Sequence, residues 1–152
     1  MNFDEKVADI CLASIKRHSM NINEWSNTII EEIHPEVQGL VELQDGELPL
    51  VSCYFSAESW YVISTRRLTG LYCGDLKEID VLDIASERFG NFKGLSNKKT
   101  EVLTITTIGN SEVKFEYETG KASMAPIYAI STLVPKLKKS QNKKMQSTQK
   151  DE

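Results

Sequence analysis

The N-terminal part of the chain has apolar residues at the spacing of an amphipathic helix. The first stripe consists of Val7, Ala8, Cys11, Leu12 and Ile15, which share one helix face. Basic residues follow this stripe, at the end where cations complement the helix dipole. The pattern therefore predicts a helix over residues 4–18.

A second stripe has a similar spacing and consists of Ile22, Trp25, Ile29 and Ile33. The His34-Pro35 dipeptide ends it, because the residue before a proline avoids the helical region. Together the two stripes predict a helical hairpin over residues 1–36, packed on or beside the main domain.

From residue 37 the apolar period changes from that of a helix to that of a strand. Turn residues such as Gly74-Asp75 and Gly109-Asn110 separate the alternating segments. The pattern predicts about seven strands, at 37–43, 50–55, 60–65, 67–73, 75–84, 101–108 and 112–118. Imperfect alternation around Asp80 and Asp83 indicates a bulge in the fifth strand.

After Gly120 the period becomes helical again, with apolar positions from Met124 to Leu137. Pro135 predicts that this helix ends near Val134 or bends there. Residues 140–152 have almost nothing apolar to bury and are predicted to form a disordered, lysine-rich tail. The predicted main domain therefore spans residues 37–139.

These elements predict an α+β fold in which an antiparallel sheet is closed by a C-terminal helix. The segment Tyr61-Val-Ile-Ser-Thr-Arg-Arg-Leu resembles the Thr-x-Arg-Leu signature of bacterial PH-like and GRAM-like domains. The segment 79–84 resembles the hydrophobic-acidic stretch that follows it. Residues 37–137 are thus similar to the pleckstrin-homology superfold, a strongly bent sheet of seven strands.

The resemblance implies a non-enzymatic binding scaffold with no catalytic residues to carry over. Phosphoinositide-binding members of the superfold use a basic cluster in the first strand pair. The corresponding segment of this chain, residues 42–48, is acidic. This departure argues against inositol-phosphate binding.

The net charge of −4 conceals two oppositely charged parts. Residues 136–152 contain six lysines and two acids, whereas residues 1–135 contain 12 basic and 20 acidic residues. An acidic body repels phosphate backbones, so nucleic-acid binding by the folded part is not expected. The lysine-rich tail is the exception.

The sequence contains no arrangement of residues typical of a catalytic or metal site. Cys11, Cys53 and Cys73 are scattered, which is typical of reduced thiols in a cytosolic protein. His18 and His34 fall at predicted helix ends and lack further ligands nearby. We therefore expect no cofactor, metal or small-molecule substrate. The absence of a signal-like start and of a long apolar run predicts a cytoplasmic protein.

Seven residues are candidates for contacts with a partner. Trp25 and Ile29 lie on the second stripe, which forms an apolar partner site if the hairpin leaves it uncovered. Arg66 and Arg67 bind either a ligand or nearby acids. A further group, Lys93, Lys98 and Lys99, lies in or beside a loop, where it is either solvated or contacts an anionic partner.

The preferred hypothesis is a module that binds another protein, or itself, through the helical hairpin or a sheet edge. One alternative is a peripheral protein that binds anionic membranes through the basic tail, with Met145 as its one apolar anchor. Another is a protein of the toxin-immunity type. An enzyme is the least favoured interpretation.

Overall fold

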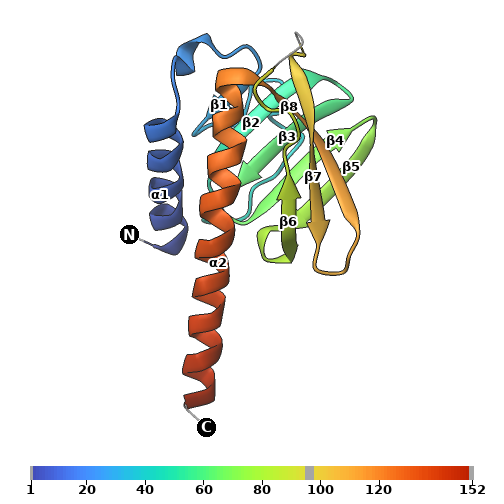
Figure 1. The fold of residues 1–152 in the computed structure, drawn as a ribbon. Coiled ribbons are helices and arrows are strands. Elements are labelled where there is room, and N and C mark those ends of the chain that lie inside the picture. The colour runs from blue at the N-terminus through green and yellow to red at the C-terminus, as the bar shows by residue number, and fades with distance from the viewer. Residues whose placement is uncertain (1, 95–97, 151–152) are drawn as a thin grey trace.

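The computed structural model describes residues 2–94 and 98–150, and the side chains only as far as residue 145. Within these residues it contains two α-helices and eight strands (Figure 1). Short 3-10 helices are labelled η. The elements are α1 (Phe3–His18), η1 (Ile22–Glu24), β1 (Thr28–Ile30), β2 (Pro49–Ser56), β3 (Ser59–Ser64), β4 (Arg67–Tyr72), β5 (Asp75–Asp80), η2 (Val81–Asp83), β6 (Ile84–Arg88), β7 (Thr100–Thr107), β8 (Glu112–Glu118), η4 (Gly120–Ser123) and α2 (Met124–Lys150).

The strands form two antiparallel sheets, one in the order β1-β2-β3-β4-β5 and one in the order β6-β7-β8. β8 packs against β3 and β4, so the two sheets enclose a shared core. α1 and α2 run side by side along one side of the sheets (Figure 1). The predicted α+β class, with antiparallel strands and a closing C-terminal helix, is confirmed.

Both faces of β3 are buried, which explains its uninterrupted apolar run. Tyr61 and Ile63 belong to the main core, whereas Trp60 and Val62 form a second cluster on the opposite face. Val37 covers this second cluster. The segment 37–43 therefore packs over the sheet as a turn with a single bridge, and the strand predicted there is wrong.

The second helix of the predicted hairpin is also wrong. Residues 22–24 form one 3-10 turn, and Thr28–Ile30 forms β1, which pairs with the edge of β2. Three consecutive β-branched residues favour a strand. The open edge of β2 supplies backbone partners that an isolated short helix would lack.

α1 forms as expected and packs into the main core. The Asn2 side chain caps it by accepting a hydrogen bond from the Glu5 amide at 2.9 Å. Its face of Val7, Cys11 and Ile15 is at most 2% exposed and belongs to the same cluster as the sheet residues. The N-terminal helix is therefore part of the hydrophobic core rather than an appendage.

The predicted fifth strand divides into β5, a 3-10 turn and β6. Asp80 caps the turn by accepting a hydrogen bond from the Leu82 amide at 3.0 Å, so a turn stands where a bulge was predicted.

In the polar loop between β6 and β7, Gly90 and Gly94 adopt positive φ. Residues 95–97 of that loop, including Ser96, lie outside the described residues.

α2 is longer than predicted. It continues through Pro135 to Lys150, so the prediction that it ends near Val134 is wrong, and residues 140–150, which were predicted to be disordered, are helical. Pro135 is exposed, and so is Ser131, whose carbonyl loses its helical partner. Water can satisfy that carbonyl, which explains why the helix tolerates the proline. Residues 151–152 lie outside the described residues.

Candidate functional site

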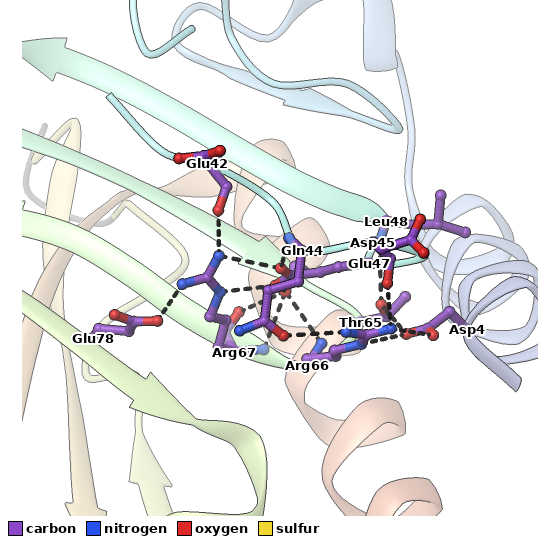
Figure 2. Close-up of polar contacts among 11 residues, drawn as sticks. Asp4, Glu42, Gln44, Asp45, Glu47, Leu48, Thr65, Arg66, Arg67 and Glu78 are labelled. Carbon is purple, nitrogen blue, oxygen red and sulfur yellow. Dashed lines mark hydrogen bonds and ion pairs between the residues drawn. The ribbon is translucent and has the colours of Figure 1, made fainter. Parts of the chain in front are cut away.

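Arg66, one of the candidate binding residues, lies in the turn between β3 and β4. Its side chain binds other residues of the chain (Figure 2). Its guanidinium group donates two hydrogen bonds to the Asp4 carboxylate, at 3.1 and 2.9 Å. It also donates to the side chain of Gln44 and the carbonyl of Asp45. Arg66 therefore fastens the start of α1 to the sheet.

Arg67 forms a still more buried pair with Glu47, whose side chain is 0% exposed. Nε of Arg67 lies 2.9 Å from one carboxylate oxygen of Glu47, and Nη2 lies 3.1 Å from the other. Glu78 and the Glu42 carbonyl accept the remaining donors of Arg67 (Figure 2). Ser64 donates to Glu47 as well.

The pKa shifts of the two acids follow from these contacts. Burial raises the pKa of Glu47, but hydrogen bonds from Arg67 and Ser64 outweigh it, so the pKa is lower than the ordinary 4.5. Hydrogen bonds from Arg66 lower the pKa of Asp4 below 3.8. Both carboxylates are thus held in the charged form, and of the two predicted roles for the arginines the structure shows pairing with nearby acids.

The three lysines of the β6–β7 loop lie elsewhere, around one depression of about 690 Å³. We call it the lysine depression. It is lined by residues of the N-terminal segment, β2, the loop and the end of β8, namely Ser26, Asn27, Phe55, Lys93, Gly94, Lys98, Lys99, Thr100, Glu118, Thr119 and Gly120.

Hydrogen bonds hold the two sides of the lysine depression in place. The Glu118 carboxylate accepts from the amides of Ser26 and Asn27, at 2.9 and 3.0 Å, and from the Thr28 hydroxyl at 2.7 Å. Thr119 donates through its amide to the carbonyl of Lys99, and through its hydroxyl to that of Lys98. The backbone of Lys98 and Lys99 is therefore fixed to the end of β8.

The electrostatics of the lysine depression favour an anion. Lys93, Lys98 and Lys99 are exposed, and within the described residues none of their ammonium groups forms an ion pair or a hydrogen bond. The one acid that lines it, Glu118, already accepts three hydrogen bonds. Gly120 begins the helical turn that leads into α2, and this end of a helix carries partial positive charge.

The remaining candidates, Trp25 and Ile29, are half-buried and do not line the lysine depression. Trp25 packs against the main core and donates its ring N–H to the Met20 carbonyl at 3.3 Å. Ile29 lies in β1 opposite Ser52. Neither residue is on a helix stripe, because the second helix is not formed.

The sequence does not indicate the acids that hold the lysine depression and the arginine turn together. Glu118 is separated from Ser26 by 92 positions, and Asp4 from Arg66 by 62. No local pattern connects residues so far apart. The acidic character of residues 42–48 was a usable signal for Glu47, since an acid beside an apolar strand needs a cationic partner when buried.

The structure also bears on metal and thiol chemistry in the described residues. Among these residues, no group of three or more His, Cys, Asp or Glu side chains could hold a metal ion. Burial raises the pKa of the Cys11 and Cys53 thiols to about 12, which leaves both protonated and unreactive. Within residues 2–94 and 98–150, no helix has the length and apolar character needed to cross a bilayer.

Comparison with known proteins finds a similarity to a solved structure. No family model and no curated protein matches the chain. A crystal structure of a DUF1696 family protein with a pleckstrin-homology domain, from Shewanella loihica PV-4, is similar with a TM-score of 0.49 and 14% sequence identity. The similarity covers 72% of this chain and 99% of that one.

Proposed function

We propose that the chain is a non-enzymatic, PH-like module that binds an acidic segment of a partner protein in the lysine depression. Kinship with the bacterial PH-like and GRAM-like domains, suggested by the Thr-x-Arg-Leu motif, and a cytoplasmic location are parts of the same proposal. The hairpin version of the interaction is withdrawn, because the second helix does not form.

The observation that carries the proposal is a contrast between two sets of cations. Arg66 and Arg67 are bound to internal acids, and their charge is already neutralised. Lys93, Lys98 and Lys99 form no ion pair in the described part of the chain, and the acid with which Lys98 interacts electrostatically, Glu101, does not line the lysine depression. Unpaired cations around one depression present positive potential on an otherwise acidic molecule, which steers and selects acidic partners.

A protein segment suits the shape and chemistry of the lysine depression. Phe55, half-buried at its wall, offers an apolar contact beside the cations. The volume of about 690 Å³ accommodates several side chains of a peptide. A ligand that combines one apolar side chain with two or three carboxylates satisfies both features.

The test compares two variants that lose the same charge. Lys93→Gln/Lys98→Gln/Lys99→Gln removes the cations of the lysine depression, and Lys6→Gln/Lys77→Gln/Lys114→Gln removes three exposed lysines elsewhere. Tagged chains are captured from the cells that express the protein, at moderate salt, and bound proteins are quantified by mass spectrometry. We expect a stoichiometric acidic partner that the first variant loses and the second retains.

Equal recovery of the partner with both variants would contradict the proposal. So would equal loss with both, since net charge rather than the site would then govern binding. Thermal unfolding of both variants, expected to match the unmodified chain because all six side chains are exposed, separates loss of binding from loss of fold.

A further inference from the structure

The second helix contains a concentration of positive charge that the lysine depression does not use. α2 has six lysines, all from Lys136 onward, and no Asp or Glu along its length. The rest of the described chain is strongly acidic, since residues 1–123 contain 12 basic and 20 acidic residues. Charge is therefore separated between the body and the second half of α2.

Three of these lysines share one side of the helix. At 100° per residue, Lys136, Lys139 and Lys143 fall within about 60° of one another and span about 10 Å along the axis. All three are exposed, and in the described residues none forms an ion pair or hydrogen bond. We call this side the cationic face of α2. Leu137, 8% exposed, and Lys138, which donates to the Ile84 carbonyl at 2.6 Å, attach the helix to the body instead.

The C-terminal part of α2 extends beyond the body, and the cationic face begins beside the buried Leu137 and runs along this part of the helix (Figure 1). Residues 141–145 are all exposed. Like charges at i, i+3 and i, i+4 destabilise a helix, and α2 has no acid to offset them. A helix that is polar all round and carries only cations gains stability from an anionic surface placed against it.

We propose that the cationic face of α2 docks an acidic helix of a partner protein. A helix can present carboxylates at the same i, i+3 and i+7 spacing as Lys136, Lys139 and Lys143, as paired helices do along their charged flanks. This docking is independent of the lysine depression, which lies at the start of α2 rather than near its end.

Two other anions fit the cationic face less well. A membrane-bound helix needs an apolar side to insert, and residues 138–145 offer Met145 alone. A bilayer or a nucleic acid also extends well beyond the 10 Å face, so it meets the acidic body within the Debye length of about 8 Å at physiological salt. An acidic helix is narrow enough to contact the lysines of the cationic face without reaching the acidic body.

The test uses the full chain and a synthetic alanine-rich helical peptide with glutamates at i, i+3 and i+7. Its control peptide has glutamine at those positions. We expect the glutamate peptide alone to bind, and Lys136→Gln/Lys139→Gln/Lys143→Gln to weaken binding about tenfold in fluorescence anisotropy. The Lys93→Gln/Lys98→Gln/Lys99→Gln and Lys6→Gln/Lys77→Gln/Lys114→Gln variants should bind as the unmodified chain does.

Several results would overturn the proposal. Unchanged peptide binding by the α2 variant would exclude this face, and weakening by the Lys93, Lys98 and Lys99 variant alone would assign the peptide to the lysine depression. Tighter binding to phosphatidylserine–phosphatidylcholine vesicles or to a DNA duplex than to the peptide would assign the face to a membrane or to nucleic acid. If the chain binds neither the peptide, the vesicles nor the DNA duplex, the proposal that the cationic face docks an anionic partner is wrong.

Discussion

Glu47 shows how far the environment of a single carboxylate decides its role in this protein. Its side chain is completely buried and accepts hydrogen bonds from Arg67, Ser64 and the Gln44 amide. Glu78 contacts the same arginine but is 53% exposed, and solvent screens its charge. Glu47 and Glu78 bind the same arginine, but the loss of Glu47 should lower the free energy of unfolding much more than the loss of Glu78.

Glu47→Gln should destabilise the fold by about 3 kcal/mol, because it leaves the Arg67 charge without its buried partner. Glu78→Gln is the control and should change the free energy of unfolding by less than about 1 kcal/mol. Urea unfolding followed by circular dichroism measures both. Similar values for the two variants would show that the buried pair contributes no more than a surface contact.

The lowered pKa values of Asp4 and Glu47 predict sensitivity to acid. A carboxylate whose folded pKa lies below its unfolded pKa contributes stability above the unfolded value and loses it as pH falls through the folded one. Stability should therefore decrease below about pH 4.5, the ordinary value for glutamate. In Asp4→Asn/Glu47→Gln the decrease should be shallower. Parallel melting temperatures of variant and unmodified chain between pH 6 and pH 3, about the range in which carboxylates titrate, would refute this assignment.

Gly70 is required by the close packing of β4 against β3 and β8. A Cβ at this position of β4 would lie 2.6 Å from the Trp60 carbonyl oxygen and 2.7 Å from the Phe115 ring. Gly70→Ala should therefore destabilise the protein by about 1–3 kcal/mol. At Gly109 nothing lies closer than 3.9 Å, so Gly109→Ala should be nearly neutral. A denaturant midpoint for Gly70→Ala as little changed as that for Gly109→Ala would mean that β4 can shift enough to admit a methyl group.

At the scale of elements, β1 is a short strand that depends on a distant acid. Glu118, at the end of β8, holds the amides that lead into it. Removing a charged acceptor from such amides costs about 1.5–3 kcal/mol. This segment therefore connects the first sheet with one side of the lysine depression.

Glu118→Ala should speed amide hydrogen exchange of Ser26 and Asn27 by at least about tenfold, because their hydrogen bonds are lost. Glu112→Ala, at an exposed position of the same strand, is the control and should leave both amides unchanged. Exchange followed by NMR gives the two rates directly. Protection that persists in Glu118→Ala would show that β1 is held by its pairing with β2 alone.

The elements that the sequence predicted correctly are those whose signals are local. α1, β2 to β4, β7 and β8 follow from apolar period and turn residues, with only small shifts at their ends. Residues 22–33 have a helical apolar period, but the open edge of β2 recruits Thr28–Ile30 as a strand. Residue propensity and apolar period carry no information about that edge. They also do not indicate that Val37 packs on Trp60 rather than forming a strand.

At the scale of the whole molecule, the candidate site was predictable in part. Loop composition indicated Lys93, Lys98 and Lys99 as contacts for an anionic partner. It could not indicate that the end of β8 and the segment before β1 would form the other side, because those contacts exist only in the folded chain. The distribution of charge along the chain can be read from the sequence. Only the structure shows which cations are paired with internal acids.

The most direct test of the central claim is chemical-shift mapping. The isotopically labelled chain is titrated with the acidic partner recovered by affinity capture, or with the segment of it that binds. We expect little change around Arg66 and Arg67. The largest amide shifts should occur at the lining of the lysine depression, at Ser26, Asn27, Lys98, Lys99 and Gly120. Shifts confined to the arginine turn, to β5 or to the end of α2 would contradict it.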